Sequence, residues 1–161
     1  MCMRRFNVWI AILFIVACEL IGSIGSLATA PNIPTWYRGL VKPPFNPPNW
    51  VFGPVWTTLF ALMGIAAYLI WQKGTAKKPV RHALTWFGIQ FTINVLWSFL
   101  FFGMQSPLLG LLCIGVLWGL IAITMQSFFR VNKIAGYLLV PYLLWVTLAT
   151  YLNAGIFILN F

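Results

Sequence analysis

The side chains that carry acid–base or nucleophilic catalysis are scarce in this sequence. Its 161 residues include one carboxylate, Glu19, and one histidine, His82. General acid–base and nucleophilic mechanisms need a base held within reach of its partner. Glu19 falls in the middle of one apolar stretch, whereas His82 lies at the basic boundary of another. The sequence therefore argues against hydrolytic or acid–base catalysis, and we predict no catalytic residue of that kind.

The three cysteines do not suggest a metal or redox centre. Cys2, Cys18 and Cys113 form no CxxC pair and have no metal-ligand spacing. Cys18 and Cys113 lie inside apolar runs, where a free cysteine behaves as a small hydrophobic side chain. We therefore predict no metal site.

Aromatic and amide side chains, by contrast, recur at helical spacing in three stretches. These stripes are Trp56, Phe60 and Met63; Gln90, Asn94 and Trp97; and Tyr142, Trp145, Ala149 and Asn153. Carboxamides are costly against lipid, so Gln90, Asn94 and Asn153 should face the interior, together with the aromatic rings on their faces. The stripes predict an aromatic cavity with a few amide and hydroxyl groups, which suits a flat and mostly apolar ligand.

Simpler explanations of the same residues stay open. Trp56, Trp97 and Trp145 are also consistent with interior packing without ligand contact, and Asn94 and Asn153 with hydrogen bonds across helices. Tryptophan is common at both membrane surfaces, and Trp50 suits either that role or a lid. The indoles that we assign to an interfacial belt are Trp9, Trp71 and Trp86.

The composition indicates the kind of element that must position these side chains. Hydrophobic residues make up 61% of the chain and charged residues 7%, with a mean hydropathy of +0.92. A soluble domain carries roughly 25% charged residues, so this is an all-α membrane protein by composition. No repeat or second domain is visible, and we treat residues 1–161 as one integral membrane domain.

Five apolar segments are long enough to cross a bilayer, which takes about 20 helical residues each. We place them at Asn7–Thr29, Gly53–Trp71, Val80–Phe102, Pro107–Phe129 and Ile134–Leu159. Pro54 fits the first turn of the second helix, and Ser106 with Pro107 forms a cap that opens the fourth. Pro141 should kink the fifth. The first segment has no clear cleavage site, which favours a retained helix over a signal peptide.

The connection between the first two segments is unusual. It runs from Ala30 to Phe52 and contains the stiff proline pairs of the window Lys42–Asn49. Loops of this length inside a compact domain are usually functional or disordered, and the prolines and aromatic residues argue against disorder. We predict an ordered lid over one end of a five-helix bundle.

Basic residues gather in the connections on one side of the predicted bundle. That side carries Arg4, Arg5, Lys73, Lys77, Lys78, Arg81, Arg130 and Lys133, whereas the lid side carries Arg38 and Lys42. The positive-inside rule then predicts a cytoplasmic N-terminus and a lid outside an inner membrane. We attribute the net charge of +9 to basic residues that determine the membrane topology and contact lipid headgroups, and not to nucleic-acid binding. Glu19 is a functional candidate inside the membrane, although a neutral, hydrogen-bonded carboxyl is equally consistent.

Three blocks of the sequence together resemble a known family. They are WYRGLVKPPFNPPNWVFGPVW, NVLWSFLFFG and VPYLLWVTLATYLN, in this order. They are similar to the TspO/MBR family of tryptophan-rich sensory and translocator proteins, also called peripheral-type benzodiazepine receptors. The resemblance covers essentially the whole chain. It implies five transmembrane helices, a common dimeric state, and a first loop that closes a pocket.

The resemblance also implies ligands and site residues. Family members bind porphyrins such as protoporphyrin IX, synthetic isoquinoline carboxamides and benzodiazepines, and, in animals, cholesterol. The pocket positions fall on Trp56, Asn94, Trp97, Trp145 and Ala149. The lid positions fall on Trp36, Tyr37 and Trp50. With the helical stripes, the predicted ligand-binding residues are Trp36, Tyr37, Trp50, Trp56, Phe60, Gln90, Asn94, Trp97, Tyr142, Trp145, Ala149 and Asn153.

Three functions remain as hypotheses. The first is a receptor or sensor for tetrapyrroles and other flat apolar ligands, with porphyrin as a ligand and no obligatory cofactor. The second is a transporter of porphyrin or lipid-like cargo, although no inverted repeat is visible. The third is light-dependent porphyrin breakdown, which the resemblance would assign to Trp56 and Trp145. Tyr151 is followed by no basic residue, so the animal cholesterol motif is absent. The expected partners are the lipid bilayer and a second copy of the chain, and no nucleic acid.

Overall fold

The computed structural model describes residues 7–161, and Cys2, Arg4 and Arg5 lie outside this range. The described residues form an all-helical bundle whose elements are α1 (Val8–Asn32), η1 (Ile33–Tyr37), α2 (Asn49–Trp71), α3 (Lys78–Ser98), η2 (Phe99–Gly103), α4 (Pro107–Val131), α5 (Lys133–Leu138) and α6 (Val140–Asn160). Five segments are long and apolar enough to cross a membrane. The predicted all-α membrane fold with five spanning helices is thereby confirmed.

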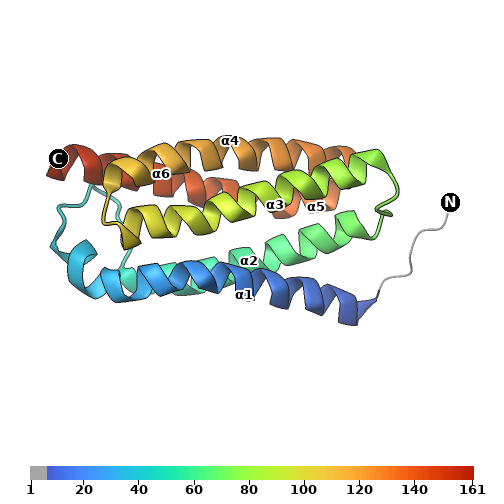
Figure 1. Ribbon diagram of the computed structural model, residues 1–161, viewed down its shortest axis with the longest axis horizontal. Coiled ribbons are helices and arrows are strands. Elements are labelled where there is room, and N and C mark those ends of the chain that lie inside the picture. The colour runs from blue at the N-terminus through green and yellow to red at the C-terminus, as the bar shows by residue number, and fades with distance from the viewer. Residues whose placement is uncertain (1–6) are drawn as a thin grey trace.

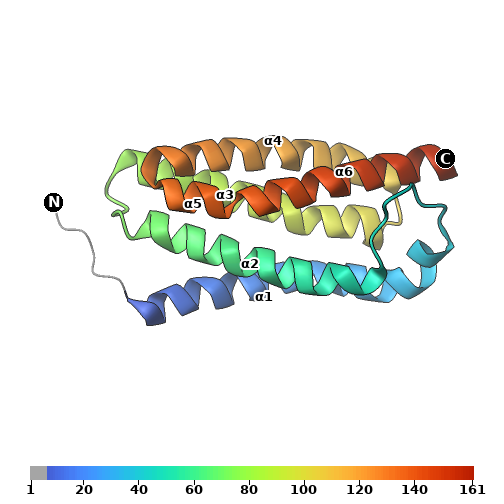
Figure 2. The same ribbon diagram turned by 180° about the vertical axis from the view of Figure 1, so that it is seen from behind.

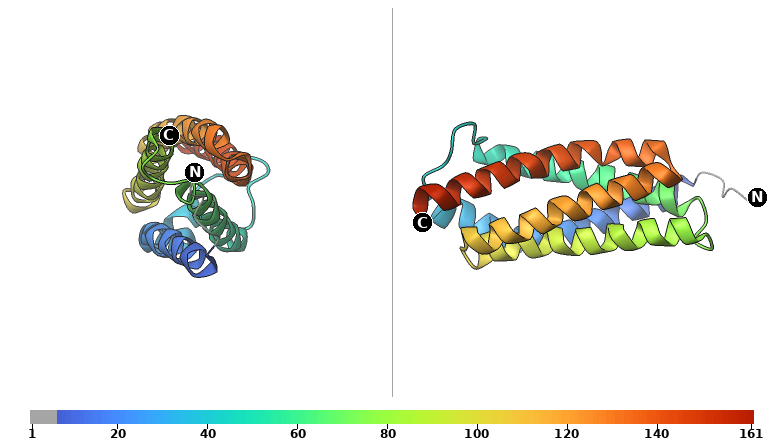
Figure 3. Two further views of the ribbon diagram at one scale, coloured as in Figure 1. Left: turned by 90° about the vertical axis from the view of Figure 1, so that its right-hand side faces the viewer. Right: turned by 90° about the horizontal axis from the view of Figure 1, so that it is seen from above.

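The long helices run antiparallel to their neighbours in the chain (Figures 1 and 2). One end of the bundle carries residues 38–48, the turn between η2 and α4, and the C-terminus. We call it the loop end. The other carries the start of α1 and the α2–α3 and α4–α5 connections, and we call it the basic end. Seen along its axis, α1 and α2 lie to one side of the group formed by α3, α4 and α6 (Figure 3).

The first helix is longer than the sequence suggested. We expected it to end at Thr29, but α1 reaches Asn32 and continues as the wide turn η1 to Tyr37. The helical path continues through Pro31 and Pro34, and two side chains of this segment donate further hydrogen bonds to backbone carbonyls. Asn32 Nδ2 donates to the Ala28 carbonyl at 2.9 Å, and Thr35 Oγ1 to the Pro31 carbonyl at 2.8 Å. In lipid, a helix that continues is cheaper than unsatisfied backbone groups.

The start of the second helix was also predicted wrongly. It begins at Asn49, directly after Pro48, so Pro54 lies inside α2 and not in its first turn. The predicted connection 30–52 therefore shrinks to a short segment between η1 and α2. A proline does mark the start of this helix, but it is Pro48, directly before the first helical residue, and not Pro54.

The other helix signals are confirmed. Ser106 Oγ accepts a hydrogen bond from Leu109 N at 3.3 Å, and Pro107 opens α4. The fifth span is broken at Leu139, two residues before Pro141, into α5 and α6. A proline lacks the amide hydrogen and clashes with the carbonyl four residues earlier, which explains the break.

The connection between η1 and α2 is held in place, as predicted for an ordered loop. Asn160 at the end of α6 clamps Val41, donating to its carbonyl and accepting from its amide, both at 2.9 Å. Tyr151 Oη donates to the Pro44 carbonyl at 3.2 Å. Buried Tyr37 donates to Asn46 Oδ1 at 2.8 Å. The loop is thus fastened to the end of α6.

Candidate functional site

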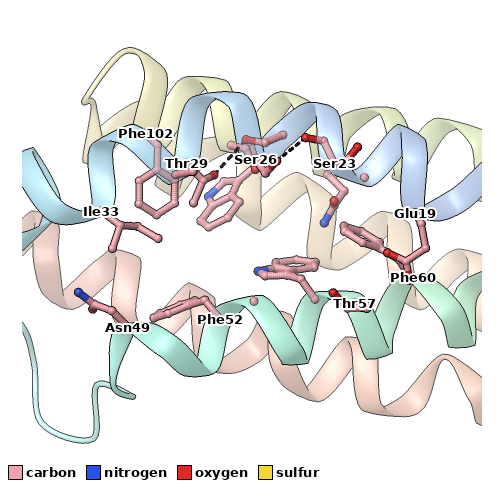
Figure 4. A pocket seen from close by; sticks show the side chains of 18 residues that line it. Glu19, Ser23, Ser26, Thr29, Ile33, Asn49, Phe52, Thr57, Phe60 and Phe102 are labelled. Atoms are coloured by element: carbon pink, nitrogen blue, oxygen red, sulfur yellow. Dashed lines mark hydrogen bonds between the residues drawn. The ribbon is translucent and has the colours of Figure 1, made fainter.

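A cavity lies between α1, α2 and α3 in the half of the bundle near the loop end, and we call it the main cavity because four of the predicted ligand-binding residues line it. Its volume is about 320 Å³, at the lower end of the range for small-molecule sites. Figure 4 shows α1 on one side and α2 on the other, with side chains of both helices pointing into the space between them. The lining residues are Glu19, Gly22, Ser23, Gly25, Ser26, Thr29, Ala30, Ile33, Asn49, Phe52, Gly53, Trp56, Thr57, Phe60, Asn94, Trp97, Ser98 and Phe102.

Close packing of α1 and α2 on the basic-end side of the cavity explains why the two helices separate toward the loop end. Gly64 of α2 lies so near α1 that a Cβ atom built on it would be 2.6 Å from Ile15 Cα. Asn7 N donates to Tyr68 Oη at 2.8 Å at the same end. Toward the loop end, the ring of Phe60 packs directly against Gly22. The two helices therefore touch at the basic end and diverge above Phe60, which leaves room between them.

One wall of the cavity is aromatic. It consists of Phe52, Trp56 and Phe60 from α2 with Trp97 and Phe102 from α3 and η2. Trp56 and Phe60 stack with their ring centroids 5.3 Å apart and an interplanar angle of 27°. Such stacked rings present flat, apolar surfaces to a ligand.

The opposite wall, on α1, is made of small and polar residues. The hydroxyl hydrogens of Ser23 and Ser26 are donated to the Leu20 and Ser23 carbonyls at 2.8 and 2.6 Å. Thr29 donates in the same way to Gly25 O at 3.1 Å. Because these hydrogens are used within the helix, the hydroxyl oxygens offer mainly acceptor lone pairs to the cavity.

Glu19 lies at the end of the cavity away from the loop, beside Phe60 (Figure 4). Within residues 7–161, no hydrogen bond or ion pair to its carboxyl is formed. The lone carboxyl joins the hydroxyl oxygens as a further acceptor on the α1 side. At the opposite end, Asn49 supplies an amide group next to Ile33 and Phe52.

Behind the aromatic wall is a buried polar network that ties α3 to α6 and α4. Tyr142 Oη donates to Gln90 Oε1 and accepts from Asn94 Nδ2, both at 3.0 Å. Trp97 Nε1 donates to Asn153 Oδ1 at 3.3 Å, and Asn153 Nδ2 donates to the Pro107 carbonyl at 2.8 Å. The predicted inward direction of the three amides is confirmed, since Gln90, Asn94 and Asn153 are 1%, 3% and 1% exposed.

The predicted ligand-binding residues separate into groups in the structure. Trp56, Phe60, Asn94 and Trp97 line the cavity. Gln90, Tyr142 and Asn153 lie in the network behind it, where the rings of Tyr142 and Trp56 make a T-shaped contact at a centroid distance of 6.3 Å. Three of the stripe residues thus support the wall and do not form it.

The remaining predicted residues lie outside this cavity. Trp36 and Tyr37 pack on Phe101 and Phe102 at the loop end, and Trp50 is 74% exposed. Half-buried Ala149 lies on α6 and is absent from the cavity wall.

Trp145 belongs to a separate, open groove between α2 and α6. This apolar groove measures about 560 Å³ and is lined by Pro54, Val55, Thr58, Leu59, Leu62, Pro141, Leu144, Trp145 and Leu148. The ring of Trp145 meets Phe52 at a centroid distance of 5.8 Å, so Phe52 stands between the groove and the main cavity. We had expected the last helix to supply a wall of the pocket, and α1 supplies that wall instead.

The contribution of α1 was missed from the sequence, although a signal was present. Glu19, Gly22, Ser23 and Ser26 follow one helical face with spacings of three and four residues. The sequence singled out Glu19 of this face as a functional candidate but did not connect it to the cavity. A face of small and polar residues around the one acid in the chain marks a cavity wall as readily as a helix contact.

Of the predicted lid 30–52, Ala30, Ile33, Asn49 and Phe52 line the cavity. The connection 38–48 in its middle does not. Among its residues, Lys42 places its Nζ 4.7 Å from the ring centroid of Tyr37. Partial burial lowers the pKa of the Lys42 ammonium from its usual value. The outer end of the cavity is closed by Ile33, Asn49, Phe52 and Phe102.

Comparison with known proteins connects this arrangement to a family. The chain matches the TspO/MBR family over residues 14–159. It is 48% identical to the tryptophan-rich protein TspO of Chlorobaculum tepidum over 143 residues, which are 89% of this chain and 90% of that protein. It is 44% identical to the protein of the same name from Archaeoglobus fulgidus over 146 residues, 91% and 94% of the two chains. Identity to the human translocator protein is 38% over 120 residues, 73% and 70% of the two chains.

Proposed function

Because the chain belongs to the TspO/MBR family, we propose that it is a membrane receptor or sensor for porphyrins and other flat, mostly apolar molecules. The site that we assign to the ligand is the cavity between α1, α2 and α3. Porphyrin acts there as a ligand and not as an obligatory cofactor.

The observation that carries this proposal is the contrast between the two walls of the cavity. Trp56 and Phe60 offer stacked ring faces, and the α1 wall opposite consists of glycines, serines and other small residues. Because the Phe60 ring already packs against Gly22, we expect a planar ring system to lie on the loop-end side of that contact, between Trp56 and the α1 wall. The low dielectric of the surroundings strengthens each polar contact that such a ligand makes.

The polar groups suggest how the ligand is oriented. Acceptor oxygens of Ser23, Ser26 and Glu19 lie along α1, so we expect the N–H or cationic groups of a ligand on that side. Asn49, at the end of the cavity near the loop, offers N–H donors. Carboxylate groups of a porphyrin are therefore expected at the loop end, where Lys42 and Arg38 also lie.

A fluorescence titration tests the proposal and distinguishes ligand binding in the main cavity from binding in the α2–α6 groove. Protoporphyrin IX should quench the tryptophan fluorescence of the wild-type protein saturably. Trp56→Leu removes a ring from the cavity wall and should raise the Kd about tenfold, which corresponds to about 1.4 kcal/mol. Trp145→Leu changes the α2–α6 groove and should leave the Kd within about twofold.

The opposite ranking of the two variants would place the ligand in the α2–α6 groove. Absence of saturable quenching in the wild type would overturn the receptor proposal altogether. Thermal unfolding of each variant without porphyrin is the control, since a loss of folded protein must not be mistaken for a loss of binding.

Two alternative activities would use the same site, and each has a direct test. Relatives carry the names tryptophan-rich sensory protein and translocator protein, and the second name is the reason to measure transport. Flux of a fluorescent porphyrin into liposomes that is equal with and without protein would exclude it. Light-dependent breakdown would draw on Trp56, which lines the cavity, and porphyrin absorbance that falls under illumination and not in darkness would support it.

We further propose the cell membrane as the location, with the N-terminus in the cytoplasm. Among the described residues, the basic end carries Lys73, Lys77, Lys78, Arg81, Arg130 and Lys133, and the loop end carries Arg38 and Lys42. Basic connections favour the cytoplasmic side.

A homodimer is proposed on separate grounds. Gly88 of α3 and the pair Gly115 and Gly119 of α4 have no atom within 4 Å of where a Cβ would lie, so these stripes of small residues are uncovered in the single chain. Small residues let helices approach closely in lipid. Cross-linking of Gly88→Leu and Gly115→Leu variants tests both stripes, and a dimer that survives in both would rule them out as the contact.

A further inference from the structure

A second site of distinct chemistry lies at the basic end, between α3 and α4. It is a groove of about 600 Å³ lined by Lys78, Pro79, Arg81, His82, Thr85, Ser127 and Arg130. We call it the basic groove. It shares no lining residue with the main cavity, which lies toward the loop end.

The positive charges of this groove have no counter-charge within the chain. The sequence contains a single acidic residue, and that residue, Glu19, lines the main cavity on α1. The C-terminus lies at the other end of the bundle (Figure 1). The charges of Lys78, Arg81 and Arg130 must therefore be balanced by anions from outside the protein.

The uncharged groups of the groove add defined hydrogen-bonding positions. His82 Nε2 accepts a hydrogen bond from Trp86 Nε1 at 3.0 Å, so in this arrangement the ring hydrogen of His82 is on Nδ1 and remains a donor. Thr85 and Ser127 donate to the carbonyls of Arg81 and Ile123 at 3.0 and 2.9 Å. Their oxygens are then left as acceptors, which suits a headgroup that carries hydroxyl groups beside its phosphate.

Apolar side chains continue from the groove along the same two helices. On α3, Ile89 and Leu96 are 42% and 43% exposed, and on α4, Ile123 and Val116 are 41% and 58% exposed. Ile89 follows Arg81 and Thr85 at steps of four residues, and Ile123 precedes Ser127 by four, so each helix presents these groups on one face. Charged groups at one end and apolar surface beyond them are complementary to a phospholipid.

We propose that the basic groove binds the phosphate headgroup of an anionic phospholipid, with its acyl chains along α3 and α4. Arg81 and Arg130 hold the phosphate from the two sides of the groove, and Lys78 adds charge at the start of α3. Basic pockets between membrane helices recognise anionic headgroups in this way, and guanidinium groups match phosphate geometry well.

Native mass spectrometry of the full-length protein in neutral detergent tests this inference. Detergent removes the surface potential of a bilayer, which would attract any basic protein. The probes are phosphatidylglycerol, phosphatidylcholine and inorganic phosphate. We expect saturable binding of phosphatidylglycerol, with phosphatidylcholine and inorganic phosphate each at least about tenfold weaker, since one lacks net charge and the other lacks acyl chains.

The decisive variants remove equal charge from the same end of the bundle. Arg81→Gln with Arg130→Gln should weaken phosphatidylglycerol binding about tenfold or more. Lys73→Gln with Lys133→Gln removes the same charge outside the groove and should change binding less than about twofold.

Equal losses in the two double variants would overturn the proposal, because binding would then follow total charge and not the groove. Equal binding of phosphatidylcholine, or full competition by inorganic phosphate at similar concentration, would overturn it as well. Thermal unfolding of the Arg81/Arg130 variant in the same detergent checks that the fold is intact.

Discussion

Glu19 is the only ionisable side chain among the residues that line the main cavity. An unpaired carboxyl inside a membrane protein is costly, and it is usually kept for a functional reason. Here it lies against a ring surface and has no partner among the described residues, so a ligand group can supply the partner. The structure thus favours the functional interpretation that the sequence left open.

We predict that Glu19→Gln abolishes a preference for cationic ligands. A suitable pair is 9-aminoacridine, which is protonated at neutral pH, and acridine, which is uncharged there and has the same ring system. The wild type should bind the cation more tightly, and the variant should lose about tenfold of that preference, since a charge-assisted hydrogen bond contributes about 1.5–3 kcal/mol. Fluorescence titration measures both ligands.

Acridine serves as the internal control for Glu19, because its affinity should be the same in both proteins. A variant that still prefers the cation to the same degree would show that Glu19 does not contact the ligand.

Tyr142 supports the cavity without lining it. Its hydroxyl donates to Gln90 Oε1 and accepts from Asn94 Nδ2 at 3.0 Å each, whereas Gln90 Nε2 has no hydrogen-bond partner among the described residues. We predict that Tyr142→Phe costs about 1–3 kcal/mol of stability, because it leaves buried amide groups unsatisfied. Thermal unfolding in detergent measures the loss, and Tyr137→Phe, at a position 65% exposed, should be neutral. Equal melting temperatures for both variants would contradict a structural role for the network.

At the scale of helices, the contact between α1 and α2 determines where the cavity opens. Gly64 allows the two backbones to approach at the basic end, and Phe60 separates them above Gly22. The cavity therefore depends on a close contact below it, although no residue of that contact lines it.

We predict that Gly64→Ala destabilises the bundle by about 1–3 kcal/mol, because the new Cβ would meet rigid backbone and not a movable side chain. The Cβ would lie 2.6 Å from Ile15 Cα. Gly53→Ala, on the same helix, is the matched control, since nothing lies within 4 Å of its Cβ position. Thermal unfolding compares them, and an unaffected Gly64→Ala protein would show that α1 and α2 are not held this tightly.

The loop between η1 and α2 depends on the end of α6. Asn160 makes two hydrogen bonds of 2.9 Å to Val41, and we predict that Asn160→Leu frees this part of the loop. Amide hydrogen exchange around Val41 should become at least about tenfold faster, since local opening no longer breaks these bonds. Ile158→Ala, at an exposed neighbouring position of α6, should leave the exchange unchanged. Slow exchange in both variants would mean that other contacts hold the loop.

At the scale of the whole molecule, the distribution of charge predicts the orientation in the membrane. The connections and helix ends at the basic end carry six of the eight described lysines and arginines. We predict that alkaline phosphatase fused to the C-terminus is active in a bacterial host, because this enzyme needs the oxidising periplasm for its disulfides. Fusion at Gly74, in the α2–α3 connection, should be inactive. The reverse result would invert the assigned topology.

The sequence by itself determined which segments are helices and which faces point inward. Both follow from costs that act on each helix separately, because lipid leaves a polar side chain or backbone group nothing to bond to. Gln90, Asn94 and Asn153 are buried for this reason. The helix limits near Pro31 and Pro48 were predicted wrongly, because α1 continues through Pro31 and α2 begins directly after Pro48.

Only the tertiary structure decided which inward faces share a cavity. Periodicity shows that a residue points inward, but not which neighbouring helix it meets. The contacts of Gly64 with Ile15 and of Gly22 with Phe60 bring α1 to the aromatic face of α2. Trp145 is turned to the groove between α2 and α6 instead. The wall that carries Glu19 therefore arises from helix packing between distant parts of the chain, which no local pattern specifies.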